Sequence, residues 1–289
     1  EPGVNVWIGM SALPSAVKTA LPAADLGRDV VLVKTFVHDG TPGLLIAGGA
    51  GQGVLYAVYE FFEQRFGVRW LAPDATHIPA APKSIAPIDY TYTPPFVHRE
   101  MGARGDRSIY RLNSPFIFGI GGHSLYFLLP PEKYFKTHPE YYSEIGGKRI
   151  APDGVDWRDI GLSGEHPGQF GQLCMSNPEV AKAIADEIDR RAQENPQANT
   201  WAVCQMDWGN NCQCAACKAI DDREGTPMGS LLTGVNRVAE LVERSHPHFF
   251  IKTYAYTYTR KSPKTIKPRQ NVIIQLCDIE CDFVRPLCD

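Results

Sequence analysis

The chain has 289 residues, a net charge of −3, 44% hydrophobic residues and 21% charged residues, which exclude a disordered chain or a coiled coil. The slight negative charge argues against nucleic acid or an anionic membrane as the main partner, since both require a clustered basic surface. No apolar run approaches the ~18 residues that a membrane span requires, and the length suggests two domains or one large barrel.

The first part of the chain alternates between strand-like and helix-like patterns. Short apolar runs at 5–9, 30–33 and 43–48, bounded by Gly, Pro or Asp, predict buried strands. From about Gly53 to Arg65 the apolar residues repeat on one face of a helix. Five prolines in residues 78–95 predict a linker, and we therefore expect a domain boundary near residue 92.

From Phe96 onward, strand-like segments alternate with helices, the clearest of which are expected at 178–194 and 229–244. This alternation favours an α/β fold in which a small α/β N-terminal domain precedes a (β/α) barrel of the TIM type. About six of the eight barrel units fit into the chain, so we expect the barrel to be incomplete. Any catalytic residue on strand seven or eight would then not be visible in this sequence. The six strands are predicted at 96–101, 116–118, 171–175, 201–206, 249–256 and 271–277.

Several stretches resemble known families. Gly51–Phe62 followed by Gly67–Pro73 resembles the accessory N-terminal domain of family 67 α-glucuronidases, and the N-domain of family 20 hexosaminidases is similar. The later part resembles the bacterial domain of unknown function 4838 at His138–Tyr142, Gln172–Pro178 and Asp207–Cys217.

The resemblance implies an accessory domain over residues 1–92 and a glycoside-hydrolase-like barrel over residues 93–289. It suggests a bacterial enzyme that removes sugars from a glycan chain end, and we expect the protein to be secreted or periplasmic. The sugar, the linkage and the oligomeric state are not indicated by the sequence.

Acidic residues that follow the predicted strands could supply the two carboxyl groups of a glycosidase. One carboxylic acid must protonate the leaving oxygen and one carboxylate must activate water or attack the sugar. We assign Asp207 as proton donor and Asp278 or Glu280 as base. In the family 67 enzymes the acid likewise follows strand four and the base follows strand six or seven. The adjacent Asp and Glu of family 20 are absent, because Trp208 follows Asp207.

Other polar and aromatic side chains near the strand ends are predicted to contact the sugar. A simpler structural role stays open for each, such as an ion pair of Arg99 with Glu100 or core packing of the tyrosines. The predicted substrate-binding residues are Arg99, His123, Gln205, Trp208, Asn210, Tyr254 and Tyr256.

Three cysteines close together in the sequence form the sharpest local motif. Cys212, Cys214 and Cys217 predict a structural zinc site or a disulfide, with Cys204 or a residue of another loop as the fourth ligand. A redox role is less favoured, since a C-x-x-C redox motif is typical of a thioredoxin-like unit.

The leading hypothesis is a glycoside hydrolase that requires no cofactor for catalysis. Two alternatives are a non-catalytic carbohydrate-binding protein on a degenerate barrel and a metal-dependent enzyme centred on the cysteine loop. Motifs typical of esterases, nucleotide-binding proteins and zinc metalloproteases are missing from the sequence.

Overall fold

The protein is described here by a computed structural model. It divides into two compact units, Glu1–Pro115 and Phe116–Asp289, each of which is described by itself. The described residues are 4–15, 18, 26–72, 74–100, 111–152, 157–158, 170–279 and 281–285.

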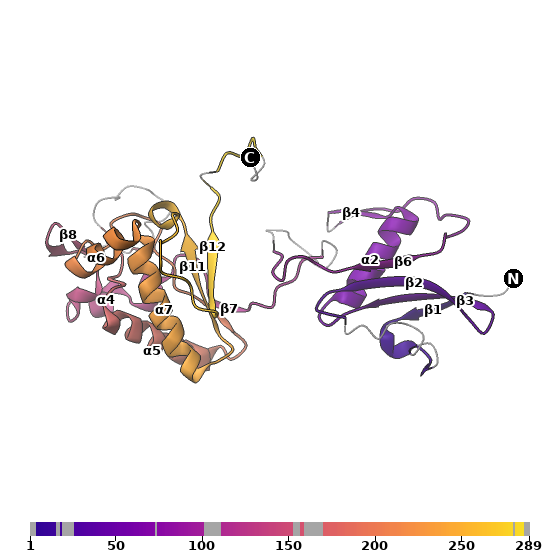
Figure 1. Ribbon diagram of the computed structural model, residues 1–289, viewed down its shortest axis with the longest axis horizontal. Helices are drawn as coiled ribbons and strands as arrows, with labels where there is room; N and C mark the ends of the chain where they lie inside the picture. The colour runs from indigo at the N-terminus through magenta and orange to yellow at the C-terminus, as the bar shows by residue number, and fades with distance from the viewer. Residues whose placement is uncertain are drawn as a thin grey trace. The chain divides into compact units, whose positions relative to one another are not determined.

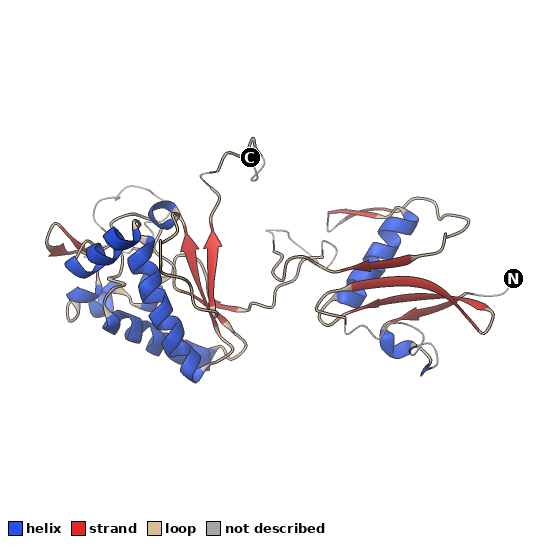
Figure 2. Ribbon diagram, in the orientation of Figure 1, coloured by secondary structure: helices blue, strands red, loops and turns tan. Residues whose placement is uncertain are grey.

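The N-terminal unit is built on a four-stranded sheet in the order β1-β3-β2-β6. Strand β1 (Asn5–Ile8) pairs in parallel with β3 (Thr41–Gly48), and β2 (Val31–His38) is antiparallel to both β3 and β6 (Asp89–Tyr92) (Figure 2). A short 3-10 helix, η1 (Met10–Ala12), follows β1. The mixed sheet confirms the three strands expected from the sequence.

Helix α2 (Gly53–Phe66) covers one face of this sheet. Its Tyr56, Ala57 and Phe61 pack against apolar side chains of β2 and β3. The helix is where the sequence predicts it, but of the expected apolar face Phe61 is buried whereas Leu55 and Phe62 are exposed. The helix ends at Gly67, whose φ of 71° is a left-handed conformation that glycine adopts without strain.

After α2 the chain forms a small hairpin from β4 (Arg69–Ala72) and β5 (Ala75–His77). The expected linker at 78–95 contains strand β6, which the prolines around it conceal in the sequence. The two compact units divide between Pro115 and Phe116, whereas the sequence predicts a domain boundary near residue 92.

The C-terminal unit contains a parallel sheet in the order β12-β11-β10-β7. Its strands are β7 (Phe118–Ile120), β10 (Thr200–Ala202), β11 (Phe250–Ala255) and β12 (Val272–Leu276), and each pairs in parallel with its neighbours (Figure 1). The unit is thus α/β, as expected. A (β/α) barrel contains such a run of neighbouring parallel strands. The described residues show these four strands as one sheet and do not show a closed barrel.

Two of the six strands expected for the barrel are not strands. The described part of 96–101 makes a single bridge, between Arg99 and Asn113 in the N-terminal unit. Residues 171–175 make a single bridge, between Leu173 and Tyr142, and their backbone bonds to the 141–143 segment rather than to the sheet, for example from the amide of Cys174 to the carbonyl of Tyr141. The burial of residues 171–175 was therefore predicted correctly, but the segment with which they form backbone hydrogen bonds was not.

Helices α5 (Pro178–Glu194) and α7 (Met228–Ser245) pack side by side on one face of the parallel sheet (Figure 1). Asn177 caps α5 by accepting a hydrogen bond from the amide of Glu179, and Pro178 occupies the first turn, as the sequence predicts.

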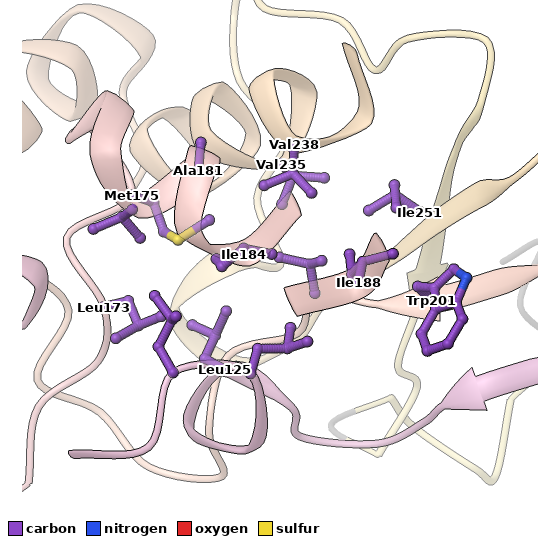
Figure 3. Close-up of a cluster of buried hydrophobic side chains, with 14 of the residues drawn as sticks. Leu125, Leu173, Met175, Ala181, Ile184, Ile188, Trp201, Val235, Val238 and Ile251 are labelled. Carbon is purple, nitrogen blue, oxygen red and sulfur yellow. The ribbon is translucent and has the colours of Figure 1, made fainter. Parts of the chain in front are cut away.

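Between the helices and the sheet lies the main core (Figure 3). Ile184 and Ile188 of α5 meet Val235 and Val238 of α7 over Ile251 of β11, and all five are fully buried.

The remaining elements are short and surround this core. They are α3 (Leu125–Leu128), α4 (Pro131–Tyr134), η3 (Pro139–Tyr141), the hairpin of β8 (Glu144–Ile145) and β9 (Lys148–Arg149), α6 (Ala215–Glu224) and η5 (Thr257–Thr259). In the part of the chain that the structure describes, we find no helix with the length and apolar character of a membrane span.

Candidate active site

The side chains with catalytic potential gather where the parallel strands end. Because parallel strands all run the same way, the residues that follow them share one edge of the sheet. Those at this edge are His123 after β7, Gln205 and Asp207 after β10, Tyr254 and Tyr256 at the end of β11, and Asp278 after β12.

His123 is held between the backbone of Gln205 and the carboxylate of Asp207. Its Nδ1 lies 2.6 Å from the Gln205 carbonyl oxygen, and its Nε2 lies 3.5 Å from Oδ1 of Asp207. A carbonyl oxygen only accepts hydrogen bonds, so Nδ1 carries a proton and donates. The other ring nitrogen, Nε2, then faces the Asp207 carboxylate. Both side chains are partly exposed, at 29% and 45%, so Nε2 and the carboxylate are within reach of a ligand.

Two tyrosine rings from β11 and the residue after it surround the same histidine. The ring centres of Tyr254 and Tyr256 lie 5.3 Å and 5.9 Å from that of His123. Burial, and to a lesser degree the nearby Cys204 thiol group, raises the pKa of Tyr254 to about 12. Its phenol therefore stays protonated at neutral pH and can donate a hydrogen bond.

Gln205 has a buried side chain that faces the turn after β11. Its Nε2 donates to Oγ1 of Thr259 at 2.7 Å and to the carbonyl of Tyr256 at 3.2 Å. Its Oε1 is buried and accepts no hydrogen bond from the described residues. Gln205 thus fixes the backbone at Tyr256, while its predicted sugar contact stays a prediction.

Trp208 and Asn210 attach the loop that follows Asp207 to a neighbouring segment. Nε1 of Trp208 donates to the carbonyl of Gly171 at 2.8 Å, and Nδ2 of Asn210 donates to the carbonyl of Phe170 at 2.9 Å. We call residues 206–211 the Asp207 loop. Both predicted sugar-contact residues therefore hold this loop in place.

The buried side chain of Gln172 completes the attachment of the Asp207 loop. Its Oε1 accepts from the amide of Met206 at 2.9 Å, and its Nε2 donates to the carbonyl of Trp208 at 2.7 Å. Sequence reasoning missed Gln172, because its role depends on a partner segment that the sequence does not reveal.

Asp278 is exposed beyond the end of β12. In the sheet, Lys252 of β11 lies beside Ala202 of β10 and Ile273 of β12. Asp207 and Asp278 both lie beyond the ends of their strands, after Ala202 of β10 and Leu276 of β12, and β11 lies between these two strands.

The two remaining predicted site residues are Glu280 and Arg99. Glu280 lies outside the described residues, and Arg99 belongs to the N-terminal unit, where its Nη2 contacts Oδ2 of Asp29 at 2.7 Å. Burial alone would raise the pKa of Asp29, but hydrogen bonds from Gln52, Arg99 and Asn113 outweigh it, and the pKa is lowered. Arg99 is thus engaged in a buried ion pair.

Four buried cysteines form a cluster beside the Asp207 loop. Cys174, Cys212, Cys214 and Cys217 place their sulfur atoms within 4.8 Å of one another, and no other group of three or more metal-ligating side chains occurs among the described residues. All four are free thiols in the structure. The thiols of Cys212 and Cys217 lower the pKa of Cys174 by hydrogen bonding, and the same contact raises that of Cys217.

The fourth cysteine of the cluster is Cys174, not Cys204, the fourth ligand named in the sequence analysis. Cys204 lies in the segment after β10, and its thiol donates to the carbonyl of Lys252 at 3.5 Å. Of the two fourth ligands that the sequence suggests, Cys204 or a residue of another loop, the structure therefore supports the second. Cys174 lies within the segment at 171–175, for which the sequence analysis wrongly predicts a barrel strand.

A large apolar hollow lies in the N-terminal unit. It has a volume of about 830 Å³ and is lined by apolar side chains such as Phe36, Phe62 and Phe66, with no titratable group among its lining residues. It cannot supply acid–base chemistry, so the edge of the parallel sheet is the better candidate for an active site.

A comparison with known families now adds to this geometry. The family described as Domain of unknown function (DUF4838) matches residues 70–289. The chain belongs to this family. The DUF4838 match includes the whole C-terminal unit and begins within the N-terminal one. No protein of the curated set matches the chain. The family 67 α-glucuronidase-like N-terminal domain stays a prediction.

Proposed function

We propose that this DUF4838 protein is a glycoside hydrolase that acts on a glycan chain end, with its site at the carboxyl edge of the parallel sheet. In this proposal the sheet is part of a (β/α) barrel, whose reactive groups always follow the strands. Asp207 is the proton donor and Asp278 the base.

The observation that carries the proposal is the pairing of His123 with Asp207 after two neighbouring strands. The Gln205 carbonyl orients the imidazole, and Nε2 lies 3.5 Å from Oδ1 of the partly exposed Asp207. A carboxyl group that is oriented by a neighbouring imidazole and open to a ligand suits the role of proton donor to the leaving oxygen of a glycoside.

Asp278 follows β12 in the same sheet as β10, and this position suits the second carboxylate. In inverting enzymes the two carboxyl groups are about 6.5–9.5 Å apart, which leaves room for a water molecule, and in retaining enzymes they are about 5 Å apart. The stereochemistry of the product therefore tests whether Asp278 acts as base or as nucleophile.

Aromatic rings beside these acids suit a sugar. Tyr254 and Tyr256 flank His123, and the apolar face of a pyranose stacks on such rings while a neutral phenol bonds its hydroxyls. The proposal therefore places the non-reducing sugar beside β11.

The test uses a panel of nitrophenyl glycosides of neutral and acidic sugars. Asp207→Asn should lower hydrolysis at least about 100-fold, as loss of a general acid does. A dinitrophenyl glycoside should restore most of the rate, because its leaving group departs without a proton. Asp278→Asn should not be rescued in this way, since it removes the base.

Asp186→Asn is the matched control, because Asp186 is an exposed acid on α5 that pairs with Lys182. Its activity should equal that of the unaltered protein. Full turnover in Asp207→Asn would refute the acid assignment. Sugar binding by calorimetry without turnover of any glycoside would instead favour a carbohydrate-binding protein. A chain that neither binds nor hydrolyses any of these sugars would refute both hypotheses.

A further inference from the structure

The four-cysteine cluster has the dimensions of a tetrahedral metal site. Four thiolates at about 2.3 Å from a zinc ion lie about 3.8 Å from one another. The Cys174 sulfur lies 3.6 Å from that of Cys214 and 3.8 Å from that of Cys217. These separations are far above the ~2.05 Å of a disulfide bond. The cluster is therefore spaced for an ion and not for a covalent pair.

The surroundings of the cluster favour negative sulfur. The backbone amide of Glu144 donates to the Cys212 sulfur at 3.3 Å, and the Arg149 guanidinium lies 3.7 Å from it. Cys214 and Cys217 flank the first turn of α6, where the helix dipole stabilises thiolates. Amide donors, a cation and a helix N-terminus are the outer contacts that metal-bound thiolates receive.

Complete ligation distinguishes this cluster from a catalytic metal site. All four cysteines are buried, with side chains at most 8% exposed. Four sulfur ligands fill a tetrahedral zinc ion and leave no position for water or substrate. The ion would thus be structural, which speaks against the metal-dependent enzyme considered from the sequence.

The cluster also joins the same two segments that carry the active-site loop. Cys174 follows Gln172, which bonds the Asp207 loop, and Cys212 comes directly after this loop. Contacts at Gln172 and at the cysteines therefore close the loop at both of its ends.

We propose that Cys174, Cys212, Cys214 and Cys217 bind one Zn²⁺ ion, and that this ion holds the Asp207 loop against residues 170–176. Each ligating thiol releases its proton as it binds. The zinc site does not depend on the proposed hydrolase function. Only the inference that the ion positions a catalytic loop rests on that function.

The metal content of the purified full chain tests the first part. Mass spectrometry should find about one zinc ion per chain, and titration with a mercurial should release it as four thiols react. Cobalt in place of zinc should give the intense visible bands of tetrahedral thiolate coordination.

Cysteine variants locate the site within the chain. Cys174→Ser should lose most of the zinc, whereas Cys204→Ser, the matched control from outside the cluster, should keep it. If Cys174→Ser does not fold, the mercurial titration and the cobalt spectrum of the unaltered chain decide alone. Four free thiols without metal, a mass lowered by disulfide formation, or stoichiometric iron would each overturn the proposal.

Hydrogen exchange tests the positioning role without any sugar. Removal of the metal should speed amide exchange at least tenfold in peptides covering 206–214, with little change in the first half of α5. Unchanged exchange in the loop would refute the positioning role. Because metal content and exchange are measured without turnover, a failure here is distinct from a failure of the proposed hydrolysis.

Discussion

At the scale of single residues, His123 orients the carboxyl group of Asp207. Its Nδ1 is bound to a backbone carbonyl and its Nε2 faces a carboxylate. The hydrogen bond at Nδ1 thus fixes the orientation of the ring and keeps Nε2 beside Asp207.

His123→Gln tests this role. A glutamine amide can still donate to the Gln205 carbonyl, but it has no second ring nitrogen to place beside Asp207. We expect hydrolysis of nitrophenyl glycosides to fall about 100-fold, within the range that general acid–base groups contribute. Kinetics with the dinitrophenyl substrate provide the control, since its rate should change far less. An equal loss for both substrates would indicate that His123 acts in another way.

Much of this site could be predicted from residue types, because strand ends are readable in the sequence. His123, Asp207, Tyr254 and Tyr256 were all selected on that ground, and the structure brings them together. Cys174 could not be selected, since nothing local to it indicates the partners around Cys212.

At the scale of elements, the end of α6 is tied to the loop between β11 and β12 by one carboxylate. The buried Glu224 accepts hydrogen bonds from the amide and hydroxyl of Thr265 and from the amide of Ile266. These bonds, led by the amide of Thr265, lower the pKa of Glu224 to about 2. The carboxylate therefore stabilises the folded state only while it is ionised.

Glu224→Gln tests this link through pH. With its pKa lowered from an ordinary 4.5 to about 2, Glu224 adds stability above pH 4.5 that is lost as the pH falls toward 2. We expect the variant to be less stable at pH 7 and to lose less stability on acidification. Urea unfolding at pH 7 and pH 3 measures both. Glu240→Gln, at an exposed site on α7, is the control, and identical pH slopes for all three proteins would contradict the link.

Strong periodicity made the long elements predictable. Helices α5 and α7 and strands β11 and β12 were expected within a few residues of their observed bounds. The segment at 171–175 was mistaken for a strand because a run of buried residues has the same sequence pattern in both cases. Its backbone hydrogen bonds can come from a neighbouring strand or from another segment.

At the scale of the whole molecule, the two units have separate cores. Val31, Val33 and Ile46 belong to the N-terminal core, and Ile184 and Val235 to the C-terminal one. The α/β class of both units followed from the alternation of strands and helices, whereas the division at Pro115 depends on the contacts of Asp29 with residues distant in sequence.

Separate cores predict separate responses to metal removal. A ligand that binds only the folded state stabilises only the unit that holds it. Calorimetry should show that chelation lowers the unfolding temperature of the C-terminal unit alone. Ile184→Ala, which should cost about 2–5 kcal/mol, identifies that transition, and Ile46→Val identifies the other. A single transition that both variants and chelation shift alike would refute the independence of the units.

The order of the parallel sheet also constrains how the chain folds. β12 follows β11 after residues 256–271, whereas β7 joins β10 only after the chain has run from Ile120 to Thr200. Closing the longer loop costs more entropy. We therefore expect β11 and β12 to pair early and β7 to dock last, so that Ile251→Val slows folding while Ile120→Val mainly speeds unfolding.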